Sequence, residues 1–292
     1  MNSRFEHSTS IVILLGWATA CFLYRVLING HLEQTSMLFI GLPTFLAMFV
    51  VMMPKCKSYT GTIMKTITIF LLMSGPLLGE GFICTLISSP LFFAVGAIVG
   101  AIADYRASRR EDSYRLKLYS MAPLLLLCLE GLDPRLSFSR FELVEGHAIV
   151  SLRADQVQDR MSRIPKFHES QPLFLKMGFP QPAYADGDGL QLGAARRIHF
   201  AGGEGKPGDL VWKVTDASDS RVVFECVSDS SHIAHWLAWQ SAEVKWRGLA
   251  PGQTEVTWKI RYRRLLDPAW YFAPWERYAV RLAGEYYTAS LR

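Results

Sequence analysis

Charged residues are scarce in this chain of 292 residues, and the scarcity is confined to one part of it. They make up 20% of the sequence, against roughly 25% in an average soluble domain. Residues 1–132 hold 10 Lys/Arg and 7 Asp/Glu, whereas residues 133–292 hold 21 and 19. This imbalance excludes a single uniform soluble domain and a disordered chain. It favours a membrane part followed by a soluble part.

Sequence motifs of catalysis and metal binding are also lacking. The five cysteines form no CxxC pair, and only Cys226 lies in the second part, so that part holds no internal disulfide. The chain contains no G-x-S-x-G, no H-E-x-x-H and no P-loop. The net charge of +5 is small and dispersed, which gives no indication of nucleic-acid binding. We therefore expect no metal, no cofactor and no nucleic-acid partner.

Long hydrophobic runs are present only in the first part. A membrane-spanning helix needs roughly 20 residues, with a range of 17–25. Four runs approach or reach this length, two of them by extension across a single Arg or Lys: residues 11–28, 37–53, 66–78 and 81–103. The sequence therefore predicts an all-α transmembrane helical region over residues 1–132, with the lipid bilayer as a partner. A cleaved signal peptide is the alternative for the first run, because Ala18-Thr19-Ala20-Cys21 loosely matches a lipoprotein cleavage site.

The number of spans stays open between four and five. Residues 118–129 form a fifth apolar run, but its 12 residues cover only about 18 Å of a roughly 30 Å hydrocarbon core. Lys and Arg cluster after the second and fourth runs, which places the N-terminus on the cytoplasmic side. We expect an integral protein of the plasma (inner) membrane. Its second part is cytoplasmic with four spans and extracytoplasmic with five.

The sequence predicts an α+β domain over residues 142–292, which a linker at 133–141 joins to the transmembrane region. We predict a strand at 143–152, short helices at 154–164 and 167–177, and a turn region at 180–189. Val157, Met161 and Ile164 share one face of the first helix. Five strands follow at 193–201, 209–216, 221–228, 238–247 and 255–264. A long helix then runs from Asp267-Pro268 to the C-terminus.

Two periodicities indicate how this domain packs. Val256, Trp258, Ile260 and Tyr262 alternate with polar residues, as in a half-buried antiparallel strand. In the last segment, apolar residues recur at helical spacing: Trp275, Ala279, Leu282, Tyr286 and Ala289. A curved antiparallel sheet around a long C-terminal helix is the α+β solution to this order. Where sheet and helix diverge, they enclose an apolar cavity.

This order resembles the START-like (Bet v 1-like, SRPBCC) superfamily, which includes polyketide cyclase/dehydrase-type and lipid-binding domains. Three segments are similar to those of the family: residues 154–157 at the entry to the first helix, 189–197 at a glycine turn and 252–257 at the final hairpin. The sequence departs from the family at 228–239, where tryptophans and histidines replace a plain strand connection. The resemblance implies a helix-grip fold whose cavity binds an apolar small molecule or lipid.

Aromatic and aliphatic residues of the predicted strands and last helix are the candidates for this cavity. Seven of the eight tryptophans lie in the second part, where they serve as core, cavity wall or lipid interface. Arg196 shares a face with Ile198 and Phe200, where it orients an acidic headgroup or pairs with an internal carboxylate. The cavity candidates are Arg196, Ile198, Phe200, Trp212, Phe224, Trp246, Trp258, Tyr262 and Leu282. The membrane-interface candidates are Trp270, Tyr271 and Phe272.

Three functions remain open from the sequence. The first is a membrane-anchored domain that binds a hydrophobic ligand. The second is a cyclase/dehydrase-type enzyme, whose polar dyad would have to come from His199, Asp229, His232 or His235. The third is an accessory membrane protein with a filled interior and a protein partner. We assign no catalytic residue at this stage.

Overall fold

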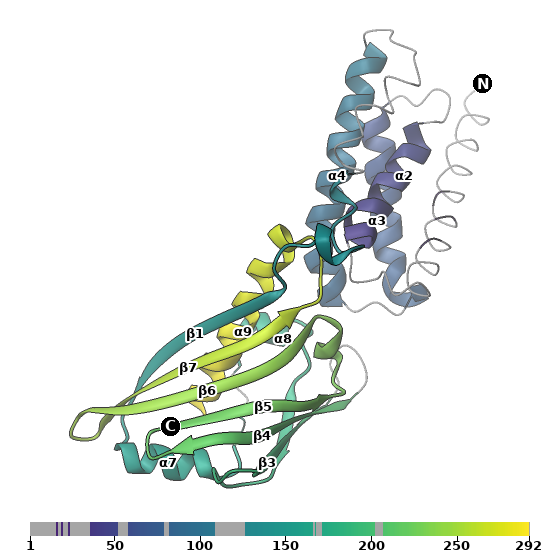
Figure 1. The fold of residues 1–292 in the computed structure, drawn as a ribbon. Coiled ribbons are helices and arrows are strands. Elements are labelled where there is room, and N and C mark those ends of the chain that lie inside the picture. The colour runs from purple at the N-terminus through teal and green to yellow at the C-terminus, as the bar shows by residue number, and fades with distance from the viewer. Residues whose placement is uncertain are drawn as a thin grey trace. The chain divides into compact units, whose positions relative to one another are not determined.

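The computed structural model describes residues 36–51, 58–78, 82–108, 126–165, 167, 171–201 and 207–291, and the single residues 16, 19 and 23. The chain divides into two compact units, Met1–Phe138 and Ser139–Arg292. Each unit is considered by itself below (Figure 1).

Helices make up the described core of the first unit. They are η1 (Met37–Gly41), α2 (Leu42–Val51), α3 (Tyr59–Leu78) and α4 (Phe82–Ser108). Helices α3 and α4 meet at two glycines of α4. A Cβ atom at Gly96 would lie 2.5 Å from Ile67 Cδ1, and one at Gly100 would lie 2.6 Å from Thr60 Cα. This G-x-x-x-G spacing lets two helices approach closely, as it does in membranes.

Asp104 near the end of α4 caps the start of α3. Its Oδ1 accepts the backbone N–H of Tyr59 at 2.6 Å, and its Oδ2 accepts that of Thr60 at 3.1 Å. The first N–H groups of a helix lack partners within the helix, and a carboxylate there also meets the positive end of the helix dipole. Asp104 therefore has a structural role in joining the two helices.

One described helix is long and apolar enough to cross a membrane, namely residues Ile83–Ser108 of α4. The predicted run at 37–53 is described up to residue 51, as η1 followed by the ten-residue α2. Apart from residues 16, 19 and 23, the predicted run at 11–28 lies outside the described residues, as do residues 118–125 of the run at 118–129. The multi-span region as a whole therefore stays a prediction.

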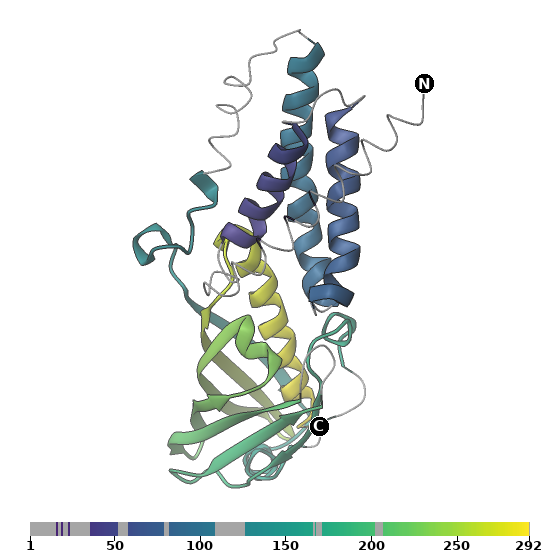
Figure 2. The same ribbon diagram turned by 90° about the vertical axis from the view of Figure 1, so that its right-hand side faces the viewer.

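The second unit contains a seven-stranded antiparallel sheet in the order β1-β7-β6-β5-β4-β3-β2. Its strands are β1 (Phe141–Val150), β2 (Pro182–Asp186), β3 (Ala195–Phe200), β4 (Gly208–Ser218), β5 (Arg221–Asp229), β6 (Leu237–Ala250) and β7 (Gln253–Arg264). After β2, each strand pairs with the next one along the chain, and β7 pairs with β1. The sheet is curved, and the long helix α9 (Ala269–Ala289) lies across its concave side (Figures 1 and 2).

The alternation predicted for the last strand is observed in β7. Val256, Trp258 and Tyr262 are at most 4% exposed, whereas Arg261 and Arg263, which flank Tyr262, are exposed to solvent. The β6–β7 connection is the two-residue turn Pro251-Gly252, in which Gly252 has a φ of +76°. Proline followed by a glycine at positive φ is the pattern of a type II turn. An antiparallel sheet around a long C-terminal helix is the helix-grip architecture that the sequence order predicted.

Short helices complete the second unit. Helix α7 (Ala154–Ser162) buries Val157 and Met161 against the core, and its start is secured by Gln156 Oε1, which accepts the Arg153 N–H at 2.9 Å. Ile164 was predicted on the same buried face, but it is half exposed because the helix ends at Ser162.

Two further predictions for this unit are wrong. The turn region at 180–189 contains strand β2, which tolerates Pro182 because β2 is an edge strand and begins at that proline. Of the helix predicted at 167–177, residues 168–170 lie outside the described residues, and the described part contains only α8 (Leu173–Lys176), which begins after Pro172.

A buried charged cluster joins β1, β7 and the start of α9. Asp267 is fully buried and pairs with two guanidinium groups, Arg264 at 2.5 Å and Arg140. Arg264 is itself fully buried, and it also donates to the carbonyl of Leu266. Glu276 in α9 is 6% exposed, and no residue in the described ranges donates a hydrogen bond to its carboxyl oxygens. This cluster fixes the point at which α9 leaves the sheet.

Candidate ligand-binding cavity

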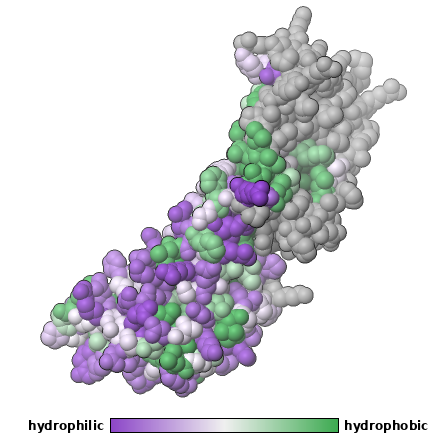
Figure 3. All heavy atoms as spheres, in the orientation of Figure 1, coloured by the Kyte–Doolittle hydropathy of each residue, from purple (hydrophilic) through white to green (hydrophobic). Residues whose placement is uncertain are grey.

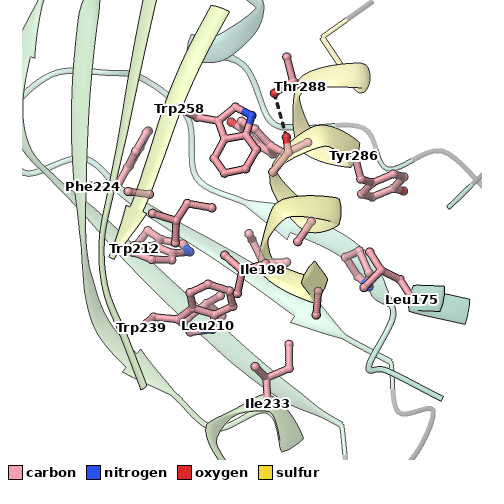
Figure 4. A pocket seen from close by; sticks show the side chains of 18 of the residues that line it. Leu175, Ile198, Leu210, Trp212, Phe224, Ile233, Trp239, Trp258, Tyr286 and Thr288 are labelled. Atoms are coloured by element: carbon pink, nitrogen blue, oxygen red, sulfur yellow. Dashed lines mark hydrogen bonds between the residues drawn. The ribbon is translucent and has the colours of Figure 1, made fainter. Parts of the chain in front are cut away.

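A cavity of about 230 Å³ lies between the concave side of the sheet and α9 (Figure 4). Its wall is almost entirely apolar and is rich in aromatic rings. Indoles come from Trp212, Trp239 and Trp258, and phenyl rings from Phe200 and Phe224. The described wall contains two charged residues, Arg196 and Glu243. The arrangement suits a molecule whose surface is mostly hydrocarbon.

Small residues of α9 leave the space for this cavity. Ala279, Ala283 and Gly284 face the sheet where larger side chains would fill the interior. Gly284 also allows a close approach, because a Cβ atom there would lie 2.6 Å from the Trp258 indole. Gly146 on β1 also allows a close approach, because a Cβ atom there would lie 2.3 Å from the Trp258 indole. The Trp258 ring is thus held between two glycines and gives the cavity a rigid wall.

The structure places six of the nine cavity candidates in the wall. They are Arg196, Ile198, Phe200, Trp212, Phe224 and Trp258. They come from β3, β4, β5 and β7, and alternation in the strands turns them toward the same side of the sheet.

The other three candidates lie outside the wall. Trp246 is 3% exposed in the core cluster, and its strand β6 contacts α7. Tyr262 is fully buried near the charged cluster at the start of α9, where it packs against Trp239 with ring centroids 6.4 Å apart. Leu282 on α9 is half-buried and is not part of the described wall, although Ala279 and Tyr286, at helical spacing from it, line the cavity.

Arg196 is the buried cation of the cavity. Arg196 is 5% exposed, and its Cζ atom lies 5.7 Å from the centre of the Phe224 ring. Nη1 donates to the Tyr287 hydroxyl at 3.0 Å, and Nη2 donates to the Met161 carbonyl at 2.8 Å. Nε has no acceptor. Among the described residues no carboxylate pairs with Arg196, so the predicted internal ion pair is absent from them.

Glu243 does not compensate this charge. Its carboxylate accepts from Arg221 and from Lys245, the latter at 3.0 Å. The Arg221 guanidinium and then the Lys245 ammonium group hold the pKa of Glu243 below its usual range, because both favour the ionised form. Its negative charge is therefore already matched by two cations.

The three membrane-interface candidates do not share one environment. Trp270 is 55% exposed, and Tyr271 is half-buried. Phe272 is 3% exposed, so it does not share the exposed position of Trp270. The reason is the helical turn of about 200° between positions 270 and 272, which directs one ring outward and the other toward the core.

The residues proposed for an enzymatic dyad lie outside the described wall. His199 pairs with Asp209 at 2.7 Å and stacks on Tyr184. Asp229 Oδ1 accepts the Ser231 N–H at 2.8 Å in the turn before η3 (His232–His235). Burial raises the pKa of Asp229 and lowers that of His232. No group of three His, Cys, Asp or Glu side chains is placed to hold a metal within the described parts of the chain.

Several wall residues were not predicted from the sequence. Leu175 and Phe179 come from the segment around α8, and Trp236 follows η3. The Phe179 and Trp236 rings meet edge to face, with centroids 5.2 Å apart. The sequence signal that could have identified these residues is the high aromatic content of their segments, which otherwise have the composition of turns. Tyr287 was also missed, because its importance depends on the contact with Arg196.

Comparisons with known proteins return structural neighbours only. No family model matches the chain, and no curated protein matches it. Three similar solved structures are the Zhui aromatase/cyclase from Streptomyces sp. R1128, a START superfamily protein from Mycobacterium smegmatis and the major latex-like protein 151 from Panax ginseng. Their identities are 14%, 14% and 11%, with TM-scores of 0.37, 0.35 and 0.35. The matches cover 52%, 51% and 52% of this chain and 92%, 93% and 96% of the other chains.

Proposed function

We propose that this protein is a membrane-anchored helix-grip domain that binds a hydrophobic or lipid-like molecule inside the cavity. The observation that carries the proposal is the apolar, aromatic wall around about 230 Å³ of space. Each Å² of apolar ligand surface buried there contributes about 25 cal/mol. The described wall offers hydrocarbon contacts and one guanidinium, with no acid–base pair, which favours binding over a cyclase-type reaction.

A cavity-filling variant tests the proposal. Ala283 lines the cavity, and Ala289 on the same helix is exposed, so Ala283→Phe and Ala289→Phe form a matched pair. We expect native mass spectrometry of the full chain in a non-ionic detergent to show a bound molecule of defined mass. Its occupancy should fall at least tenfold in Ala283→Phe, because the added ring takes the ligand's space, and should persist in Ala289→Phe. Equal occupancy in both variants would assign the molecule to the outer surface and contradict a cavity ligand.

Membrane anchoring is supported by the first unit. On the face shown in Figure 3, hydrophobic residues gather over its described helices, whereas hydrophilic residues predominate over the second unit. Leu72 on α3 is 71% exposed and Ile98 on α4 is 49% exposed, which costs free energy in water and none in lipid. With the apolar helix Ile83–Ser108, these residues favour contact with the bilayer.

Fractionation tests the anchor. We expect the full chain to remain in the membrane pellet after extraction with alkaline carbonate, which removes peripheral proteins. A reporter fused after residue 292 then reads the side of the membrane, cytoplasmic for four spans and extracytoplasmic for five. Release of the chain by carbonate would contradict the anchor while leaving the cavity proposal intact.

A further inference from the structure

Arg196 is the cation of a mostly apolar wall, and among the described residues it has no counter-ion. Its partner Tyr287 is adjacent in α9 to Thr288, which lies with Trp258 at one end of the cavity (Figure 4). Ile233 of η3 lies at the opposite end. The cavity is therefore polar and cationic at one end and apolar at the other.

The cationic end of the cavity offers hydrogen-bond donors to a ligand. Nη1 and Nη2 of Arg196 donate to the Tyr287 hydroxyl oxygen and the Met161 carbonyl, whereas no described residue accepts from the buried Nε–H. Because the Tyr287 oxygen accepts from Arg196, its own proton remains available for donation. An unpaired donor on a buried charge is costly, and natural structures rarely leave one unmatched.

The partners of Arg196 do not neutralise it. Met161 contributes a carbonyl and Tyr287 a hydroxyl, both uncharged. Phe224 offers a ring face, which stabilises a cation weakly. Glu243, the other charged wall residue, is held by Arg221 and Lys245. An anion that accepts from both the Nε–H of Arg196 and the Tyr287 O–H would supply the opposite charge.

We propose that the ligand is an anionic amphiphile, whose carboxylate head accepts from Arg196 and Tyr287 and whose single apolar chain extends toward Ile233. A carboxylate has two coplanar oxygens for two neighbouring donors, and its pairing with a guanidinium is a strong, charge-assisted interaction. The inference rests on the proposed function, since it names the ligand class of the same cavity. It assigns Arg196 to specificity and the aromatic wall to affinity.

Three probes with one tail and different heads test the head group: decanoate, decanol and decylamine. Each is titrated into the full chain in a non-ionic detergent, with the tryptophan fluorescence of the wall as readout. We expect decanoate to bind at least tenfold more tightly than decanol, and decylamine to bind most weakly because its ammonium group meets Arg196. Equal affinities for decanoate and decanol would overturn the anionic head while supporting the cavity. Binding of none of the three would overturn the proposed function itself.

Variants on one strand provide the matched control. Arg196→Met should weaken decanoate at least tenfold and leave decanol unchanged, because Met keeps the apolar bulk and removes the charge. Arg197→Met alters the next residue of β3, whose side chain is 58% exposed, and should leave the preference for decanoate intact. Arg196→Lys, which retains the charge, should restore part of the preference if Arg196→Met folds poorly. Loss of the preference in both Arg196→Met and Arg197→Met would contradict a specific role for Arg196.

The source of the anion is resolved by competition. Inorganic phosphate and acetate carry the head-group charge without a tail. We expect neither to displace decanoate at tenfold excess, because most of the binding surface is apolar. Displacement by either ion alone would identify a site for a free anion and overturn the amphiphile.

Discussion

Replacing Asp267 by Asn is expected to lower the free energy of unfolding of the second unit by about 3–5 kcal/mol. Asp267 is fully buried, and it is the carboxylate that pairs with both Arg140 and Arg264. Arg264 is fully buried as well, so the substitution leaves a cation in the interior without a formal counter-ion. Removing one partner of a buried ion pair costs far more than the pair itself contributes, because the remaining charge stays desolvated.

The measurement is denaturant unfolding of the full chain, followed by tryptophan fluorescence, which reports mainly the second unit because seven of the eight tryptophans lie there. Asp216→Asn is the control, since Asp216 is 56% exposed and pairs with Arg221 at the surface. Its loss should cost below about 1 kcal/mol. Similar destabilisation by the two variants would show that the Asp267 cluster is not a buried electrostatic centre.

This cluster also matters for the cavity. Asp267 connects Arg140 before β1, Arg264 at the end of β7 and the first turn of α9. Since α9 provides the small residues that leave the cavity open, the direction in which it leaves the sheet determines how much space remains. A destabilised cluster should therefore also weaken ligand binding in variants that still fold.

The main elements of the second unit were predictable because each has a strong local pattern. Strand β7 alternates with a period of two, and α9 has apolar residues at helical spacing after Asp267-Pro268. Strand β2 was not predictable, because Pro180, Pro182 and the glycines after them are typical of turns. It forms only through pairing with β3, a tertiary effect that no local pattern contains.

The cavity was predictable in part for a similar reason. Alternation identifies which strand residues face inward, and this placed Arg196, Ile198 and Trp258 on the correct side of the sheet. It does not say where along the strand the cavity ends, so Trp246 and Tyr262 were included although they are buried in the core outside the described cavity wall. The contact between Tyr287 and Arg196 joins residues 91 positions apart and has no local signal.

Glu276 gives the second large expected effect, on the pH dependence of stability. Burial raises its pKa to about 9, and the nearby carboxyl groups of Glu142 and Asp267 act in the same direction, while Arg264 opposes them. The ordinary value is 4.5. The folded protein thus keeps a proton on Glu276 that the unfolded chain releases above pH 4.5. Since the unfolded state binds fewer protons in this window, stability falls by about 1.4 kcal/mol per pH unit between roughly pH 4.5 and 9.

Glu276→Gln should remove this slope, because Gln resembles the protonated carboxyl group in shape and has no proton to lose. At pH 7.5 the expected gain over the wild type is up to about 4 kcal/mol, and near pH 4.5 the two proteins should be equally stable. Denaturant unfolding at a series of pH values measures the difference between them, in which the other titrating groups cancel. Glu285→Gln on the same helix is the control, since Glu285 is 48% exposed and pairs with Arg281. A parallel pH profile for wild type and Glu276→Gln would show that Glu276 is ionised in the folded protein and would contradict its raised pKa.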